Sequence, residues 1–207
     1  MFPPDLTWYF PRSSREAAAV LRGREDAALH GGGTGLLRTA SAKIGALIDL
    51  SRAGLSYVRK EGGCTAAGAA TVYSDFIRLS AGFPSGAALV RAAAAQTAAT
   101  PIRNRITLGG GIADRPVWSD LWPALLAANA EIVGGGPEDE KTNFTAREYL
   151  EKKIFRTRHL VTEIRIPDAD LVWFTRRGTL TSFDYPVFSL AFAARIEGIE
   201  PGLYRYL

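Results

Sequence analysis

The feature that most constrains this chain is the glycine run His30-Gly31-Gly32-Gly33-Thr34-Gly35-Leu36. Glycine accepts positive φ without strain, so successive backbone N–H groups of such a run can converge on one bulky anion. Thr34 adds a hydroxyl donor at its end. A diphosphate suits this concave row of donors. The alternative is a flexible loop between two elements, because short glycine motifs often occur without a ligand.

Two common phosphate-binding motifs are excluded by the neighbouring residues. A P-loop ends in Gly-Lys-Ser/Thr, whereas Gly35 is followed by two leucines. The dinucleotide fingerprint Gly-x-Gly-x-x-Gly also fails, because its last position falls on Leu36 when counted from Gly31 and on Arg38 when counted from Gly33.

A second loop, Thr107-Leu108-Gly109-Gly110-Gly111, repeats the combination of a threonine with glycines. Two separated rows of N–H donors suggest one elongated phosphate ligand held from both sides. Arg103 and Arg105 alternate just before this loop. We expect them to be a solvated pair, and the alternative is that one of them faces a phosphate or a partner while the other is solvated.

The composition is that of an ordinary globular protein: 207 residues, 47% hydrophobic and 22% charged, enough for one large or two small domains. The net charge of +4 fits an anionic cofactor or an acidic partner. No basic stripe is interleaved with aromatic residues, so a nucleic-acid partner is not expected. Neither a secretory signal nor an apolar run of the roughly 20 residues needed for a membrane span is visible, which predicts a cytoplasmic location.

Cysteine and histidine are scarce. Cys64 is the only cysteine, so no intrachain disulfide can form, which is typical of a reducing compartment. Together with His30 and His159 it cannot assemble an iron–sulfur cluster or a closed zinc site. No metal site is therefore predicted, and any redox metal is expected on another chain.

Hydrophobic patterning and turn residues predict an α/β chain. Helix Gly86–Thr100, rich in alanine, must stop before Pro101. The third glycine triplet, 134–136, is expected in a polar loop rather than in a binding site, because it lacks a threonine and acids follow it. The remaining expected elements are helices over 15–22, 72–79, 119–129 and 145–150, and strands over 27–29, 44–50, 55–59, 64–70, 131–133, 160–166 and 172–174.

These motifs resemble the FAD-binding subunit or domain of the molybdenum hydroxylases, which include xanthine, carbon monoxide and aldehyde dehydrogenases. That family has Ala-Gly-Gly-Thr-(Asp/Asn)-Leu in its first loop and Ile-Arg-Asn-x-x-Thr-Leu-Gly-Gly-Asn in its second. This chain has 31–36 in the first place and Ile102–Gly111 in the second. The family's following Asp-Leu-x-Pro-Ala-Leu-Leu-Ala matches Asp120–Ala127. The resemblance covers roughly residues 3–195.

The resemblance implies a two-subdomain α/β (α+β) fold of the vanillyl-alcohol-oxidase and CO-dehydrogenase type, with FAD extended between the subdomains. The expected division is 1–54 for the first FAD-binding subdomain, 55–183 for the second, and 184–207 for a truncated remnant of a C-terminal domain.

The same resemblance implies the cofactor-binding residues. Both glycine loops would hold the diphosphate, Ser119 and Asp120 would lie near the ribityl and phosphate region, Leu160 and Val161 would contact the isoalloxazine, and Arg176 would stabilise the reduced ring. Tyr185 is a candidate ring-stacking residue. The predicted cofactor-binding residues are Gly31, Gly32, Gly33, Thr34, Gly35, Leu36, Thr107, Gly109, Gly110, Gly111, Ser119, Asp120, Leu160, Val161 and Arg176.

Two glycines depart from the family pattern. Gly35 replaces an acid or amide and Gly111 replaces an asparagine, so two side-chain hydrogen bonds of about 1 kcal/mol each are missing. We expect weaker FAD binding rather than its loss, because the backbone contacts do not depend on these side chains.

The predicted function is that of an electron-transfer subunit. A molybdopterin subunit would oxidise the substrate, an iron–sulfur subunit would relay electrons, and FAD here would pass them to NAD+, quinone or O2. No residue of this chain is predicted to be catalytic. The alternatives are a self-sufficient flavin oxidase or dehydrogenase, and a non-enzymatic scaffold that has lost FAD.

Overall fold

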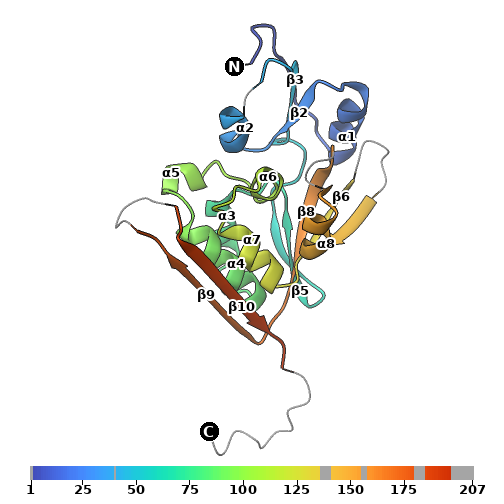
Figure 1. The fold of residues 1–207 in the computed structure, drawn as a ribbon. Helices are drawn as coiled ribbons and strands as arrows, with labels where there is room; N and C mark the ends of the chain where they lie inside the picture. The colour runs from blue at the N-terminus through green and yellow to red at the C-terminus, as the bar shows by residue number, and fades with distance from the viewer. Residues whose placement is uncertain (1, 40, 136–140, 155–157, 180–184, 197–207) are drawn as a thin grey trace, which may run out of the picture.

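A computed structural model describes residues 2–39, 41–135, 141–154, 158–179 and 185–196. Its N-terminal unit is a three-stranded parallel sheet of order β1-β3-β2 with two helices (Figure 1). The central strand β3 is buried along its whole length, as expected for a parallel strand covered on both faces. The elements of this unit are β1 (Thr7–Tyr9), α1 (Ser14–Gly23), β2 (Ala27–His30), α2 (Thr34–Arg38) and β3 (Ala46–Asp49).

The larger unit is built on a five-stranded antiparallel sheet of order β4-β5-β8-β6-β7. Its strands are β4 (Val58–Glu61), β5 (Cys64–Gly68), β6 (Glu131–Gly135), β7 (Lys141–Thr145) and β8 (Leu160–Pro167). Its helices are α3 (Tyr73–Leu79), α4 (Ser85–Gln96), α5 (Thr100–Arg103), α6 (Leu108–Asp114), α7 (Leu121–Ala127) and α8 (Ala146–Glu151).

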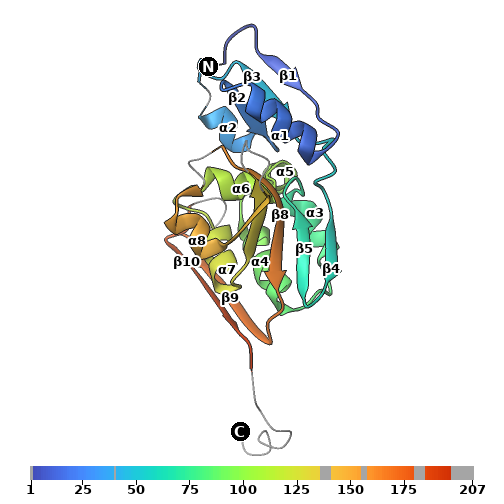
Figure 2. The same ribbon diagram turned by 90° about the vertical axis from the view of Figure 1, so that its right-hand side faces the viewer.

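A hairpin of β9 (Leu171–Arg177) and β10 (Phe188–Ala194) completes the described fold. Helices α4 and α7 lie between this hairpin and the five-stranded sheet (Figure 1, Figure 2). Strand pairing in this hairpin joins residues before and after position 183, where the sequence predicts a domain boundary. The predicted domain boundaries themselves stay predictions.

Strand β8 connects the two hydrophobic cores. Val161, Ile164 and Ile166 belong to the core of the larger unit, with Phe76, Leu125 and their neighbours. Leu160 instead packs with Leu21, Ile48 and Leu50 in the core of the N-terminal unit. Leu160 and Val161 are adjacent and so point to opposite faces of the sheet. A β-bulge, marked by the register shift against β6 between Val133 and Gly134, brings Val161 onto the face of Ile164 and Ile166.

The elements expected from the sequence do not include β1, α2, α5, α6, β7 or β10, and two expected segments end elsewhere in the structure. Helix α4 ends at Gln96, and Pro101 lies in the first turn of the separate helix α5, where a missing N–H costs nothing. Strand β6 continues through Gly134 and Gly135, which pair with β7 and β8, whereas residue 136 lies outside the described residues. In the described part of the chain, no helix is long and apolar enough to cross a membrane.

Candidate functional site

Both glycine loops line one cavity of about 520 Å³ between the two units. Thr34 from the first loop and Thr107 from the second are both among its lining residues. A cavity of this size and mixed polarity is typical of small-molecule and cofactor sites. Of the predicted cofactor-binding residues, the cavity is lined by Gly31, Gly32, Gly33, Thr34, Gly35, Leu36, Thr107, Gly110, Gly111, Ser119, Asp120 and Arg176.

The two loops are packed against each other as well as against the cavity. A Cβ atom on Gly31 would lie 2.6 Å from Thr107 Oγ1, and one on Gly32 would lie 1.5 Å from the carbonyl oxygen of Arg105. Gly32 is therefore required by the close approach of two backbones, and Gly31 leaves room for the Thr107 side chain. The predicted convergence of the loops follows directly from this contact.

The first loop has the backbone that its glycines favour. Gly33 has φ +79° and precedes α2, and no side chain caps the first N–H groups of that helix. In the described chain, no protein group accepts a hydrogen bond from the N–H of Gly31, Thr34 or Gly35. Beneath the loop, His30 Nδ1 lies 3.0 Å from Asp49 Oδ2, which links β2 to β3. This loop can therefore offer several amide donors to an anion.

The second loop is not a row of free donors, which corrects that prediction. Thr107 is the N-cap of α6, and its Oγ1 accepts a hydrogen bond from Gly110 N at 3.1 Å. The amides of Leu108 and Gly109 donate to the carbonyls of Thr71 and Ala69. The glycines here allow close packing, since a Cβ on Gly109 would lie 2.8 Å from the Cβ of Ala69. What the loop offers a ligand is the proton of the Thr107 hydroxyl and the exposed backbone of Gly110.

Arg103 and Arg105 are a solvated pair only in part, because Arg103 is half-buried and Arg105 is exposed, and both donate hydrogen bonds to backbone carbonyls. Arg103 donates to the carbonyl oxygen of Thr97 at 3.2 Å and to Thr100 Oγ1 at 2.8 Å. The guanidinium of Arg105 lies 3.4 Å from the carbonyl oxygen of Gly32 and so reaches the first loop. Arg103 belongs to α5 rather than to an extended segment, so the alternation assumed from the sequence does not exist.

Asp120 and Arg176 form an ion pair on the wall of the cavity. Arg176 Nε lies 3.1 Å from Asp120 Oδ2, and the two side chains are 16% and 3% exposed. Asp120 also accepts hydrogen bonds from Ser189 Oγ and, at 3.4 Å, from Thr97 Oγ1. It precedes α7 but makes no side-chain cap, so its carboxylate holds the hairpin of β9 and β10 to the cavity instead.

Residues near the two departures from the family pattern fill the space that a side chain would need. A Cβ on Gly35 would lie 2.6 Å from Asp114 Cγ, and a Cβ on Gly111 would lie 2.5 Å from the Tyr73 hydroxyl oxygen. Arg38 donates to both carboxylate oxygens of Asp114, at 2.8 and 2.6 Å. Asp114 and Tyr73 line the cavity, so polar groups are present beside both glycines.

The lining of the cavity includes two aromatic residues in contact, Trp118 and Tyr185, of which the sequence analysis named only Tyr185. The Trp118 ring lies 4.4 Å from that of Tyr185, centroid to centroid, and the guanidinium carbon of Arg38 lies 5.3 Å from the Trp118 centroid. Tyr185 was a candidate and does line the cavity. Neither Trp118 nor Arg38 belongs to a glycine motif, so no local signal identifies them.

Three predicted residues lie outside the lining of this cavity: Gly109, Leu160 and Val161. Gly109 packs on Ala69 behind the second loop. Val161 is buried in the larger core, and Leu160 lines a separate cavity between α1 and the five-stranded sheet. Because Leu160 and Val161 contribute to different cores, the structure does not bring them together at one site.

Comparison with known proteins gives concordant matches. Residues 4–169 match the family model described as the FAD-binding domain in molybdopterin dehydrogenase. The chain is 34% identical over 177 residues to the carbon monoxide dehydrogenase medium chain of Hydrogenophaga pseudoflava, a match that covers 81% of this chain and 60% of that one. It therefore spans less than two thirds of the length of that relative.

A second relative is the glyceraldehyde dehydrogenase medium chain of Sulfolobus acidocaldarius, 26% identical over 209 residues, covering 97% of this chain and 73% of the relative. Among solved structures, the fold superposes with a TM-score of 0.81 on a Hydrogenophaga pseudoflava carbon monoxide dehydrogenase that lacks the Mo-pyranopterin moiety of its cofactor. That match has 28% sequence identity and covers 96% of this chain and 72% of the other.

Proposed function

This chain belongs to the family of FAD-binding domains of molybdopterin dehydrogenases, and we propose that it is the FAD-carrying electron-transfer part of a multi-subunit oxidoreductase. The observation that carries the proposal is the convergence of two glycine loops and the Asp120–Arg176 pair on one cavity. Family membership identifies the cofactor as FAD, and most of the residues predicted to bind it line this cavity, which supports the proposal.

The residues of the cavity fit FAD. The amides of the first loop, the Thr34 and Thr107 hydroxyls and the nearby Arg105 suit a diphosphate. Leu29, Ile102 and Ile106 add an apolar part to the same cavity, which suits a flat ring. Ser119 and Asp120 offer polar oxygens to hydroxyl groups of the ligand.

Bound FAD would supply the redox chemistry, and the protein supplies position and charge. Arg176 places a positive charge at the cavity wall, where it favours an electron-rich ring. Asp120 offsets part of this charge and fixes the guanidinium through their 3.1 Å contact. The pair would thus set both the orientation and the strength of the field at the ring.

The electron path would begin and end outside this chain. We infer that an iron–sulfur subunit delivers electrons, that a molybdopterin subunit oxidises the substrate, and that NAD+, quinone or O2 accepts the electrons. The medium-chain names of both relatives support a multi-subunit complex. In the part of the chain that the structure describes, no cluster of histidine, cysteine or acidic residues could hold a metal ion.

The test is an absorption spectrum of the purified chain after incubation with FAD and gel filtration, followed by anaerobic addition of candidate electron donors. Retained flavin that is reduced only when a partner iron–sulfur subunit is added supports the proposal. Reduction by a small alcohol or amine without any partner would indicate a self-sufficient oxidase or dehydrogenase. A colourless protein that retains no FAD would indicate a scaffold that has lost its cofactor.

A further inference from the structure

Tyr73 is a buried tyrosine that reaches the cavity proposed to hold FAD. It is the first residue of α3, it is 3% exposed, and its ring belongs to the core of the larger unit. It also lines the cavity, although neither glycine motif includes it. The core therefore fixes the ring, while one part of the residue faces the space for the ligand.

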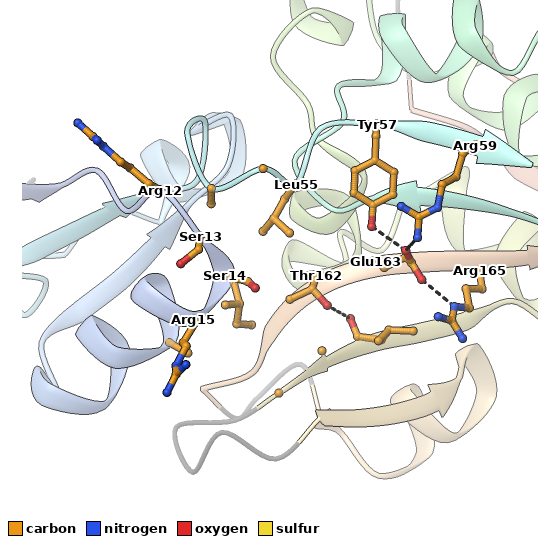
Figure 3. A pocket seen from close by; sticks show the side chains of 17 residues that line it. Arg12, Ser13, Ser14, Arg15, Leu55, Tyr57, Arg59, Thr162, Glu163 and Arg165 are labelled. Atoms are coloured by element: carbon orange, nitrogen blue, oxygen red, sulfur yellow. Dashed lines mark hydrogen bonds and ion pairs between the residues drawn. The ribbon is translucent and has the colours of Figure 1, made fainter. Parts of the chain in front are cut away.

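The hydroxyl group of Tyr73 has no hydrogen-bond partner among the described residues. A buried tyrosine hydroxyl usually has one. Tyr57 shows the usual case in the cavity between α1 and the five-stranded sheet, where its hydroxyl donates to Glu163 Oε2 at 2.6 Å (Figure 3). The buried polar atoms that lack both a partner and contact with solvent do not include the Tyr73 oxygen, so this atom is open to the cavity. A ligand in the cavity can therefore supply the missing partner.

The position of Tyr73 is fixed relative to the second glycine loop. Its backbone N–H donates to the carbonyl oxygen of Ile106 at 2.9 Å, one residue before Thr107. A Cβ atom on Gly111, in the helix that Thr107 caps, would lie 2.5 Å from the Tyr73 hydroxyl oxygen. The hydroxyl therefore occupies the space that a side chain at position 111 would fill, on the loop that also presents the Thr107 hydroxyl to the cavity.

The Tyr73 hydroxyl is available as a hydrogen-bond donor. Burial, together with the charges of Asp120 and Asp114, raises the pKa of Tyr73, so its hydroxyl stays protonated at neutral pH. Those two carboxylates line the same cavity, but they accept from Arg176 and Arg38 and not from Tyr73. The proton of the hydroxyl is thus left for an acceptor atom of a ligand.

We propose that Tyr73 is a cofactor-binding residue whose hydroxyl donates a hydrogen bond to an oxygen of the diphosphate or ribityl part of FAD. This inference rests on the proposed function, because it takes FAD as the ligand of the cavity. The diphosphate and ribityl part is the segment that offers oxygens beside the Thr107 hydroxyl. Because the ring of Tyr73 is already held in the core, the contact forms without the cost of ordering a mobile side chain.

The test is Tyr73→Phe, which removes the hydroxyl oxygen and keeps the ring in the core. The affinity for FAD, measured by isothermal titration calorimetry, should fall about tenfold, because a hydrogen bond to the ligand is lost. Urea unfolding of the FAD-free chain should not change, since the hydroxyl bonds to no described group of the protein. The visible absorption bands of the bound flavin should also stay in place, because the contact is not made to the isoalloxazine ring.

The matched control is Tyr149→Phe. Tyr149 is 1% exposed and belongs to the same core, but it lies outside the lining of the FAD cavity, so this variant should bind FAD as the original chain does. An unchanged affinity in Tyr73→Phe, equal losses in the two variants, a loss of stability in FAD-free Tyr73→Phe, or a shift of its flavin bands would each overturn the inference. In all of these outcomes the original chain still binds FAD, so the proposed function survives. If the original chain binds no FAD, the proposed function fails and the inference fails with it.

Discussion

The carbonyl oxygen of Arg105 lies 1.5 Å from the position that a Cβ atom on Gly32 would occupy. Two loops separated by more than seventy residues are thus in backbone contact at the cavity. Because a carbonyl group of the main chain cannot rotate away as a side chain can, this contact tolerates glycine alone and fixes the distance between the two units.

Gly32→Ala should destabilise the protein and weaken FAD binding. Relieving the overlap forces a backbone shift, which costs about 1–3 kcal/mol in the free energy of unfolding. Urea unfolding and FAD titration check the two effects. Gly23→Ala is the matched control: nothing lies within 4 Å of its added Cβ, so stability should hold or rise slightly. Equal behaviour of the two variants would contradict this interpretation of the loop contact.

Arg176→Met should be strongly destabilising. It leaves the Asp120 carboxylate, 3% exposed, without its cation, and breaking a buried ion pair typically costs about 3–5 kcal/mol. Adding Asp120→Leu should recover much of the loss, because the unpaired charge is then removed. A double-mutant cycle by chemical denaturation measures the coupling, and additive losses would show that the pair is not coupled.

Gly35→Asp introduces one of the two residues, Asp or Asn, of the family pattern that the first loop resembles, yet it should weaken both stability and FAD binding here. The new side chain would begin 2.6 Å from Asp114 Cγ and place two carboxylates together. Combining it with Asp114→Gly should restore FAD affinity to near that of the original chain. Tighter FAD binding by the single variant than by the original chain would show that Asp114 does not fill the space beside Gly35.

Glu163→Gln tests the pH dependence of a cluster on the five-stranded sheet in which Tyr57, Arg59 and Arg165 all donate hydrogen bonds to the Glu163 carboxylate. Burial raises the pKa of Glu163, but hydrogen bonds from Tyr57 and Arg165 outweigh burial and hold the pKa below its ordinary value. The carboxylate therefore contributes stability that is fully present above the unfolded pKa of about 4.3 and is lost as the pH falls through the folded pKa.

At neutral pH the variant should be about 1–3 kcal/mol less stable, because charge-assisted hydrogen bonds are weakened. The difference from the original chain should shrink in acid unfolding experiments below pH 4.3, the unfolded pKa. Tyr57 stays a donor throughout, since burial and its bond to Glu163 raise the pKa of its hydroxyl to about 12. Glu151→Gln, in an exposed pair with Arg147, should show no such dependence.

The sequence predicts the meeting of the two glycine loops because two separated loops, each with a threonine and several glycines, suggest one elongated phosphate ligand held from both sides. It does not distinguish a loop of free amides from a helix start. Gly33 has a positive φ, whereas Gly109 to Gly111 lie in α6 with Thr107 as their cap. A threonine next to several glycines can form either a loop with free amides or the start of a helix. Only the acceptor of each N–H group distinguishes the two structures.

Side chains that act across long sequence separations were beyond prediction. Arg38 meets Asp114 and Trp118 through the docking of the two units, and no periodicity records that docking. Leu160 and Val161 are adjacent in a correctly predicted strand, yet they belong to different cores because the strand is shared. The alternation of side chains along a strand predicts which residues share a face, but it does not predict which element packs against that face.

The most direct test of the central claim is the FAD affinity of Thr34→Glu compared with that of Leu37→Glu. Both add one carboxylate to α2 at exposed positions, but Thr34 lines the cavity and Leu37 does not. If the diphosphate lies between the loops, Thr34→Glu should weaken FAD binding at least about tenfold, or 1.4 kcal/mol, with the fold intact. Leu37→Glu should bind as the original chain does. Equal affinities in the two variants would contradict the placement of FAD in this cavity.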